Sequence, residues 1–387
     1  MPTTAALSWS GVTARRMARV ALAEPSADQD PAGVAGLLCG AHAQVLSAAE
    51  LSIGRRIAGA TRADVRRALW QQRTLVKTFG PRGTVHLLPA ADLPVWTGAL
   101  SALPSLTSAH PEGVRFSPQQ ADEVIAAIGD ALADAEMTVD ELTEAIAGRL
   151  GPRAVERTMA AFQDMWPRWR QLTSSAAHRG VLCFGPDRGR KVTYTNPQRW
   201  LPGFLPADGD AAMRVLVTRY LHAYGPATPR HFARWLGIPA RYAAGLFCRL
   251  AGDLERVEVD GTPGWAIAGD TGTPAAQHRG VRLLPYFDAY VVAAQPREWL
   301  YPGAAATRAL TPTGQAGNYP VLLVDGVVSG VWHQRRSGRK LAITVEPLRE
   351  LTASQYRQLG DEVDLVGAVM EATATLTVGP VRVGAHA

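Results

Sequence analysis

The sequence contains little cysteine and no long apolar run. Its three cysteines, Cys39, Cys183 and Cys248, are far apart and form no C-x-x-C pair, which excludes a disulfide framework and a cysteine-rich zinc site. No stretch reaches the roughly 18 apolar residues that a membrane helix requires, so we expect no membrane contact. The first residues also lack the layout of a signal peptide, and we therefore expect a cytoplasmic protein.

Lysine is scarce as well. Lys77, Lys191 and Lys340 are the only lysines among 40 basic residues, and the net charge is +6. Arginine suits phosphates and base edges because its planar fork donates two parallel hydrogen bonds. Codon bias in a GC-rich genome explains the excess of arginine equally well. The charge therefore permits a nucleic-acid partner without requiring one.

The sequence motifs of several common enzyme classes are also missing. We find no P-loop, no dinucleotide fingerprint and no hydrolase elbow. The histidines His86, His222 and His231 are scattered, with no acidic residue or cysteine at ligand spacing. We therefore expect neither a metal ion nor a cofactor.

What the sequence does contain is a recurring order of elements: helices followed by a β-hairpin. In the clearest copy, Thr228-Pro229 starts a short helix that Gly237 ends. The turn Gly261-Thr262-Pro263-Gly264 then joins two predicted strands. The predicted helices cover residues 212–224, 231–236 and 240–250, and the predicted strands cover residues 254–259 and 265–268. This order is typical of a winged helix.

Two earlier segments follow the same order. One starts near Pro118, continues with a capping-box pattern at Thr138 and Glu141, and places its third helix within residues 154–174. Its hairpin joins residues 180–184 to residues 192–194. The first copy has helices within residues 12–72 and a hairpin of residues 74–79 and 84–88.

Strands dominate after residue 280. The predicted strands cover residues 281–284, 321–324, 327–332, 341–345 and 373–378, and a helix covers residues 348–371. Asp325-Gly326 makes a tight turn, and residues 333–340 form a basic hairpin tip. This part should be a partly closed β-barrel or a curled sheet with one helix.

These patterns define an α+β protein of three tandem winged-helix units and a C-terminal β-barrel-like domain. At 387 residues the chain is long enough for two to four domains, each with its own core. We expect the winged-helix units at residues 1–110, 111–205 and 206–278, and the barrel-like domain at residues 279–387.

Repeated winged helices favour double-stranded DNA as the partner. A helix of this module enters the major groove while the hairpin follows the backbone or the minor groove. Cations at the hairpin tips neutralise phosphates and release counterions, although such a tip can also be merely solvated, and winged helices also bind proteins. The expected DNA-binding residues are Arg82, Arg188, Arg190, Gln334, Arg335, Arg336, Arg339 and Lys340. His333, Asp288 and Tyr290 are candidates for lining a DNA channel, although a structural contact suits Asp288 and Tyr290 equally well.

Five segments, in this order, resemble the bacterial winged-helix family that includes the AlkZ-type DNA glycosylases. They are RGTVHL (82–87), HRGVLCFGP (178–186), RYL with YGPAT (219–228), LPYFDAY (284–290) and VDGV with GVW (324–332). The resemblance runs from about residue 31 to residue 378. It implies a C-shaped channel for duplex DNA and hydrolysis of the N-glycosidic bond of alkylated purines. It also implies bulky N7-alkylguanine adducts as substrates, self-resistance to a genotoxic natural product, and a monomer at the nucleoid. Whether interstrand cross-links are unhooked stays open.

The family's catalytic signature, Gln-apolar-Gln, matches His42-Ala43-Gln44, with histidine in place of the first glutamine. Residues two apart on a helix point about 200° from one another, so both can face one substrate only if the backbone is extended or irregular. Gly40 supplies a break. The resemblance implies that Gln44 positions a water molecule and that His42 orients it or accepts its proton.

Alternatives to this assignment stay open. His42 could be a histidine bonded to backbone, and the chain could be a DNA-binding regulator without catalysis, or a protein that sequesters adducts. No lysine lies near the motif to form a Schiff base, which favours a monofunctional glycosylase over a lyase.

Overall fold

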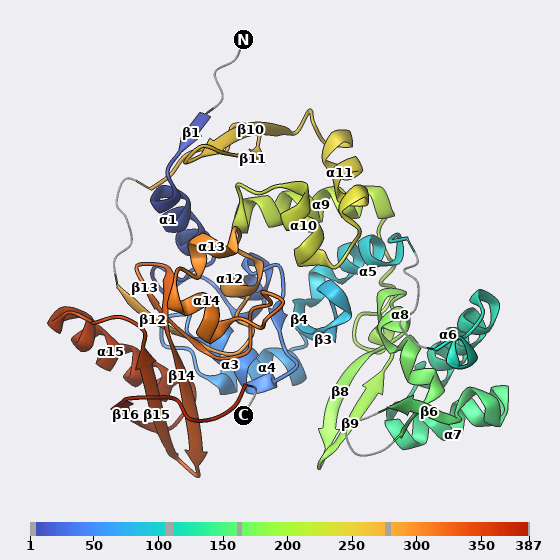
Figure 1. Ribbon diagram of the computed structural model, residues 1–387. Coiled ribbons are helices and arrows are strands. Elements are labelled where there is room, and N and C mark those ends of the chain that lie inside the picture. Colours follow the sequence, from blue (N-terminus) through green and yellow to red (C-terminus); the bar gives the residue numbers. More distant parts are fainter. Residues whose placement is uncertain (1–4, 105–110, 161–164, 275–279, 386–387) are drawn as a thin grey trace. The chain divides into compact units, whose positions relative to one another are not determined.

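The computed structural model describes residues 5–104, 111–160, 165–274 and 280–385. The chain forms two compact units: one combines Met1–Ala68 with Val217–Ala387, and the other is Leu69–Leu216. Helices and strands are mixed along the chain (Figure 1), which confirms the α and β content expected from the sequence. The predicted boundaries at residues 110 and 278 lie outside the described residues. Within the described ranges, no helix is both long and apolar enough to span a bilayer.

Four helices make up most of the described residues among the first 70. They are α1 (Trp9–Arg19), α2 (Pro31–Leu37), α3 (Leu46–Gly54) and α4 (Arg62–Trp70). Asp30 caps α2, because its carboxylate accepts the amide of Gly33 and Pro31 occupies the first turn. Two short strands, β1 (Ala5–Leu7) and β2 (Ala41–His42), interrupt this part of the chain.

The segment after residue 208 follows the predicted order closely. Its elements are α9 (Gly209–Tyr224), α10 (Pro229–Leu236), α11 (Ala240–Arg249), β10 (Leu254–Val259) and β11 (Thr262–Ile267). Thr228 forms a full capping box with His231. The predicted turn over residues 261–264 is too long. Val259 pairs with Thr262, and Asp260 and Gly261 both have positive φ (41° and 80°), as a two-residue type I′ turn requires.

The two predicted hairpins of the unit Leu69–Leu216 are present. They are β3 (Leu75–Phe79) with β4 (Val85–Pro89), and β8 (Cys183–Arg188) with β9 (Lys191–Thr195), to which β5 (Glu136–Thr138) adds. The second turn is shorter than expected, because Arg188 pairs with Lys191 and leaves Gly189-Arg190 as its centre. The main helices are α5 (Leu93–Ser101), α6 (Pro118–Leu132), α7 (Val139–Leu150) and α8 (Thr173–His178).

The helix predicted within residues 154–174 is wrong. The described part of this segment instead forms β6 (Arg157–Ala160), β7 (Met165–Pro167) and a 3₁₀ turn, Arg168–Leu172. Pro167 explains the difference, since a proline inside a helix removes a hydrogen bond and clashes with the preceding turn. α8, which ends in His178, is the helix before the hairpin.

His178 gives this unit a measurable dependence on pH. Burial lowers the pKa of His178 from 6.5 to about 4, against the opposing effect of the Gly80 carbonyl. Folding therefore favours the neutral ring, and this stabilisation is complete above pH 6.5 and is lost as the pH falls toward 4. We expect about 2 kcal/mol of its contribution to the free energy of unfolding to disappear between pH 7 and pH 5. Urea unfolding of wild type and His178→Gln at both pH values measures this, and an equal loss in the variant would contradict it.

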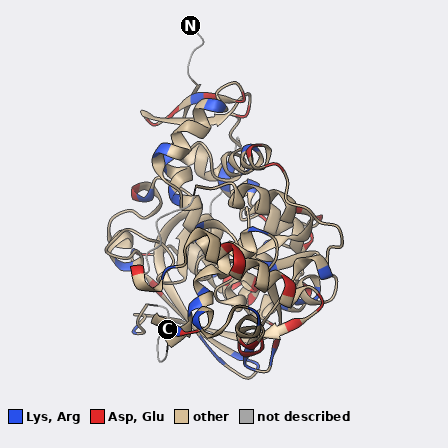
Figure 2. Ribbon diagram, turned by 90° about the vertical axis from the view of Figure 1, so that its right-hand side faces the viewer, with Lys and Arg blue, Asp and Glu red and all other residues tan. Residues whose placement is uncertain are grey.

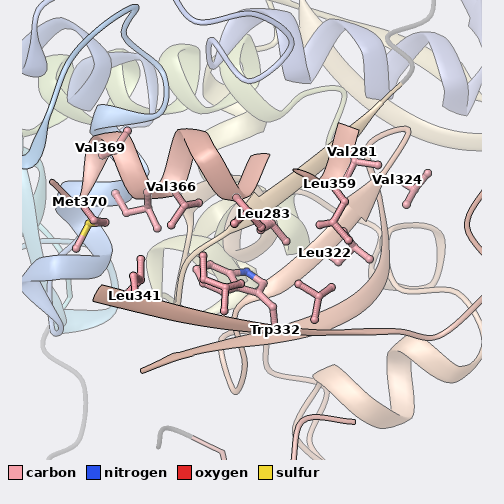
Figure 3. Close-up of a cluster of buried hydrophobic side chains, with 14 of the residues drawn as sticks. Val281, Leu283, Leu322, Val324, Trp332, Leu341, Leu359, Val366, Val369 and Met370 are labelled. Atoms are coloured by element: carbon pink, nitrogen blue, oxygen red, sulfur yellow. The ribbon is translucent and has the colours of Figure 1, made fainter. Parts of the chain in front are cut away.

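The C-terminal sheet forms one side of a large hydrophobic core. Its strand order is β12 (Val281–Leu284), β13 (Val321–Val324), β14 (Val327–Ser337), β15 (Lys340–Pro347) and β16 (Thr373–Val378). Neighbours are antiparallel except β15 and β16, which are parallel, and the sheet curls as a half-barrel (Figure 1). α15 (Ala353–Val369) packs on β12 and β16. Figure 3 shows buried side chains of α15, such as Val366, facing Leu283 and Trp332 of the sheet.

Two details of this part differ from the prediction. α15 begins at Ala353, five residues later than expected, because Thr352 forms a capping box with Gln355. Between β12 and β13 the chain forms three short helices that the sequence pattern did not reveal: α12 (Ala289–Ala293), α13 (Arg297–Leu300) and α14 (Ala304–Ala309). Helices of four to six residues are too short to show a helical period.

Candidate active site

His42 and Gln44 lie in a short non-helical segment between α2 and α3. Cys39 and Gly40 have positive φ (52° and 94°), which ends α2 and turns the chain into β2. Ala41 and Ala43 are fully buried, whereas His42 is half-buried and Gln44 is exposed. β2 ends at His42 and Gln44 lies in the bend that follows, so neither residue is helical, and both side chains are accessible, His42 partly and Gln44 more fully. The backbone thus meets the geometric condition that a joint action of the two side chains requires.

The elements on either side of the motif are firmly packed. α3 starts at Leu46, two residues after Gln44, and every residue from Ala48 to Gly54 is buried. Before the motif, the hydroxyl of Tyr224, which is fully buried on α9, donates to the carbonyl of Leu38 at 2.8 Å. These contacts fix both ends of the segment that carries His42 and Gln44.

The ring of Phe287 packs on the imidazole of His42. Their centroids are 4.4 Å apart, and the ring planes are inclined by 31°. Phe287 precedes α12 and is half-buried, like His42. The sequence alone did not single out Phe287 as a site residue, since it stands some 240 positions from the motif in the chain.

A buried ion pair joins the segment of Phe287 to α3. Arg56 donates from both terminal nitrogens to the two oxygens of Asp288, each at 2.8 Å, and the hydroxyl of Ser52 adds a bond of 2.7 Å. Burial opposes ionisation of Asp288, but Arg56, Ser52 and the Tyr290 amide outweigh it and keep the pKa of Asp288 below its ordinary value. Arg56 and Ser52 were not recognised from the sequence, which offers no local signal for a pair 232 residues apart.

Asp288 and Tyr290 therefore do not line a channel. Each is only 1% exposed. The carboxylate of Asp288 is used by Arg56 and Ser52, and the hydroxyl of Tyr290 donates to the carbonyl of Gly326 at 2.9 Å. The expectation that they face DNA is wrong because both side chains complete hydrogen bonds inside the core, where they hold α12 in place.

The basic residues of the C-terminal hairpin lie mainly on strands. Ser337 pairs with Lys340, so the turn is Gly338-Arg339, while Arg335 and Arg336 belong to β14. The predicted tip over residues 333–340 is therefore too wide. Arg335, Arg336, Arg339 and Lys340 are exposed, and His333 and Gln334 are half-buried. Partial burial and Arg335 lower the pKa of His333.

Charges of both signs are distributed over the fold (Figure 2). The hairpin differs from this mixed pattern because four of the six residues from Arg335 to Lys340 are cations. Within this group, Arg336 also has a structural contact, donating to the carbonyl of Met370 at 2.9 Å.

The three remaining predicted DNA-binding arginines belong to the unit Leu69–Leu216. Arg82 is half-buried in the β3–β4 turn and has a positive φ of 60°. Arg188 pairs with Glu141 at 2.9 Å, which reduces the net charge at that position. Arg190 is exposed at the centre of the β8–β9 turn.

The chain combines a curled C-terminal sheet, helices and hairpins before it, and a His-apolar-Gln segment near the N-terminus. These features agree with the class of DNA glycosylases that the sequence resembles. A family profile for AlkZ-like DNA glycosylases matches residues 35–369, and the chain belongs to this family. The predicted resemblance is thereby confirmed, and the chain is an enzyme of the DNA glycosylase class.

Two comparisons show its similarity to a glycosylase from Streptomyces sahachiroi, one by sequence and one by structure. The interstrand DNA cross-link repair glycosylase is 34% identical over 348 residues, which cover 84% of this chain and 87% of that protein. The solved structure of the DNA glycosylase AlkZ superposes with a TM-score of 0.79 at 27% identity, covering 96% of this chain and 99% of that one.

Proposed function

We propose that this enzyme is a monofunctional glycosylase that hydrolyses the N-glycosidic bond of alkylated purines, with bulky N7-alkylguanine adducts as substrates. The observation that carries the proposal is the placement of His42 and Gln44 as accessible side chains of one short non-helical segment, within a chain of the AlkZ-like family. The cross-link repair named for the relative from Streptomyces sahachiroi supports extending the substrates to interstrand cross-links.

The reaction requires little acid catalysis. A guanine alkylated at N7 is cationic, so the C1′–N9 bond breaks with its electron pair moving to N9, and the base leaves neutral. A water oxygen then bonds to C1′ and loses a proton. In our proposal the amide oxygen of Gln44 accepts a hydrogen bond from this water, and the neutral imidazole of His42 orients it or takes its proton. The products are the free alkylated base and an abasic sugar.

The proposed mode of DNA binding follows from the order of elements and from the family resemblance. The order of helices and hairpins supports three tandem winged-helix units, at residues 1–110, 111–205 and 206–278, with a barrel-like domain after them. The family resemblance implies that they hold the duplex in a C-shaped channel. We also propose that the enzyme acts as a monomer in the cytoplasm, at the nucleoid, where it provides self-resistance to a genotoxic natural product.

One assay tests the proposed reaction. The enzyme is incubated with duplexes carrying a panel of N7-alkylguanine adducts of increasing size, and free base and abasic sites are measured by mass spectrometry. We expect release from adducted duplexes and none from unmodified ones. Tight binding of adducts without release would indicate sequestration, and selective binding of an unmodified sequence would indicate a regulator; either result contradicts the proposal.

The C-terminal hairpin is proposed as a second contact with the DNA backbone. Alanine at Arg335, Arg339 and Lys340 should weaken binding of all DNA sequences. The negative slope of log K against log salt should become less steep by about three, because each cation releases counterions from one phosphate. Arg336 is kept because it holds the Met370 carbonyl.

The matched control for the hairpin is Arg349→Ala with Arg357→Ala, two exposed arginines of the same domain but outside the hairpin. Fluorescence anisotropy over a range of salt concentrations gives both slopes. Equal slopes in wild type and the hairpin variant would show that the hairpin is a solvated turn without contact to DNA phosphates.

A further inference from the structure

We propose that Phe287 is a positioning residue for His42: its ring fixes the plane of the imidazole that faces the substrate. The proposal rests on the proposed function, because it assigns Phe287 a role only through His42. The observation behind it is the contact of the two rings, 4.4 Å between centroids at 31°. Rotation of a histidine ring about χ2 has broad, shallow preferences, so an aromatic ring against its face restricts the orientation of both ring nitrogens.

The backbone of Phe287 is held in a conformation that a bulky residue rarely adopts. Its φ is +56°, in the left-handed region, which costs about 1–3 kcal/mol for a residue other than glycine. The next residue, Asp288, is fully buried and bonded to Arg56 and Ser52. These hydrogen bonds hold the turn in place and orient the side chain of Phe287 toward His42. Strained backbone that surroundings maintain in this way is typical of functional sites.

Gly317 confines the Phe287 ring further. A Cβ atom at Gly317 would lie 2.2 Å from Cδ1 of Phe287, far closer than van der Waals contact permits. Gly317 itself is buried and has a φ of +106°, which strongly favours glycine. The Phe287 ring therefore contacts both the imidazole of His42 and the backbone of Gly317, and any side chain at residue 317 would displace it.

This arrangement suits a residue that must orient water. Catalysis through a positioned water depends on the direction of the accepting nitrogen, and displacement by about 1 Å can lower a rate by about 10²-fold. Phe287 has no group that can exchange a proton, so its contribution is the orientation of His42. The expected consequence of losing the ring is a slower chemical step with unchanged DNA affinity.

The test compares Phe287→Leu, Phe287→Tyr and Gly317→Ala with wild type in single-turnover base release. We expect a rate about tenfold or more lower in Phe287→Leu and Gly317→Ala, and recovery to within about threefold of wild type in Phe287→Tyr, which keeps the ring. DNA affinity should stay within about twofold, since Phe287 acts on orientation and not on binding. Phe79→Leu removes another half-buried phenylalanine, from the unit Leu69–Leu216, and controls for general loss of packing.

A spectroscopic readout separates positioning from stability. In protein with ¹³C-labelled histidine, the His42 resonance, assigned by its disappearance in His42→Gln, should move when Phe287→Leu removes the ring current, and Phe287→Tyr should restore it. A wild-type rate, or an unmoved His42 resonance, in Phe287→Leu overturns the positioning role. If His42→Ala itself retains full base release, the catalytic assignment of His42 fails instead, whatever the Phe287 variants do.

Discussion

His42→Ala is expected to lower the single-turnover rate of base release by about 10²- to 10⁴-fold, the range that one positioned proton acceptor contributes. Gln44→Ala should lower it by about 10²- to 10³-fold, since an amide that orients water is comparable to one group of an oxyanion site. Both side chains are accessible, His42 partly and Gln44 more fully, so each truncation removes a group from the site without disturbing the buried Ala41 and Ala43. The rates are measured with enzyme in excess over an adducted duplex.

Binding and folding provide the controls for these two variants. We expect DNA affinity and melting temperature close to wild type, because His42 is half-buried and Gln44 exposed. His42→Gln restores the Gln-apolar-Gln signature and should retain more activity than His42→Ala. Full base release by both alanine variants would show that the motif is not catalytic in this chain, even though the family assignment would remain.

Arg56→Met is expected to lower the free energy of unfolding by about 3–5 kcal/mol, because it leaves the carboxylate of Asp288 buried and without its cation. Both side chains of the pair are fully buried. The pKa of Asp288 is held below its ordinary value in the folded protein. The stabilisation from its ionised form is therefore complete above the pKa of the unfolded chain and is lost as the pH falls through the lower folded value. The variant should thus be destabilised at neutral pH.

Urea unfolding at pH 7 measures this loss, with Arg62→Met as the matched control. Arg62 pairs with Glu371 at 3.2 Å, but both side chains are partly exposed, so the control should lose less than about 1 kcal/mol. The double variant Arg56→Met with Asp288→Leu should regain part of the lost stability, because no buried charge then remains. Similar losses in Arg56→Met and Arg62→Met would show that the Arg56–Asp288 pair does not hold α3 and the Phe287 turn together.

Much of the secondary structure could be predicted because its signals are local. The capping-box pattern at Thr138 and the Thr228-Pro229 N-cap marked the starts of α7 and α10, and Asp325-Gly326 marked the turn between β13 and β14. These signals depend on one to four neighbouring residues, so they act in the same way in any fold. The prediction failed within residues 154–174, where the described residues form strands and a 3₁₀ turn and Pro167 disfavours a continuous helix.

The catalytic candidates came from the family resemblance, because its Gln-apolar-Gln signature matches His42-Ala43-Gln44. The residues that surround them in the fold could not be predicted from the sequence. Phe287, Asp288 and Gly317 come from a part of the chain more than 230 residues away, and Asp288 was expected to face DNA. Whether a carboxylate points to solvent or to a buried arginine depends on which distant segments pack together, and no local pattern records that choice.

The sequence by itself determined most of the longer elements of this protein, the family to which it belongs and the motif that the family resemblance selects. Local backbone preferences and turn chemistry suffice for the first, and short ordered segments for the others. Only the tertiary structure decided that His42 packs on Phe287 and that Arg56 pairs with the carboxylate of Asp288. It also decided that Gly317 leaves room for the Phe287 ring. These contacts form when burial excludes water and every polar group must find a partner within reach, which is a property of the packed chain as a whole.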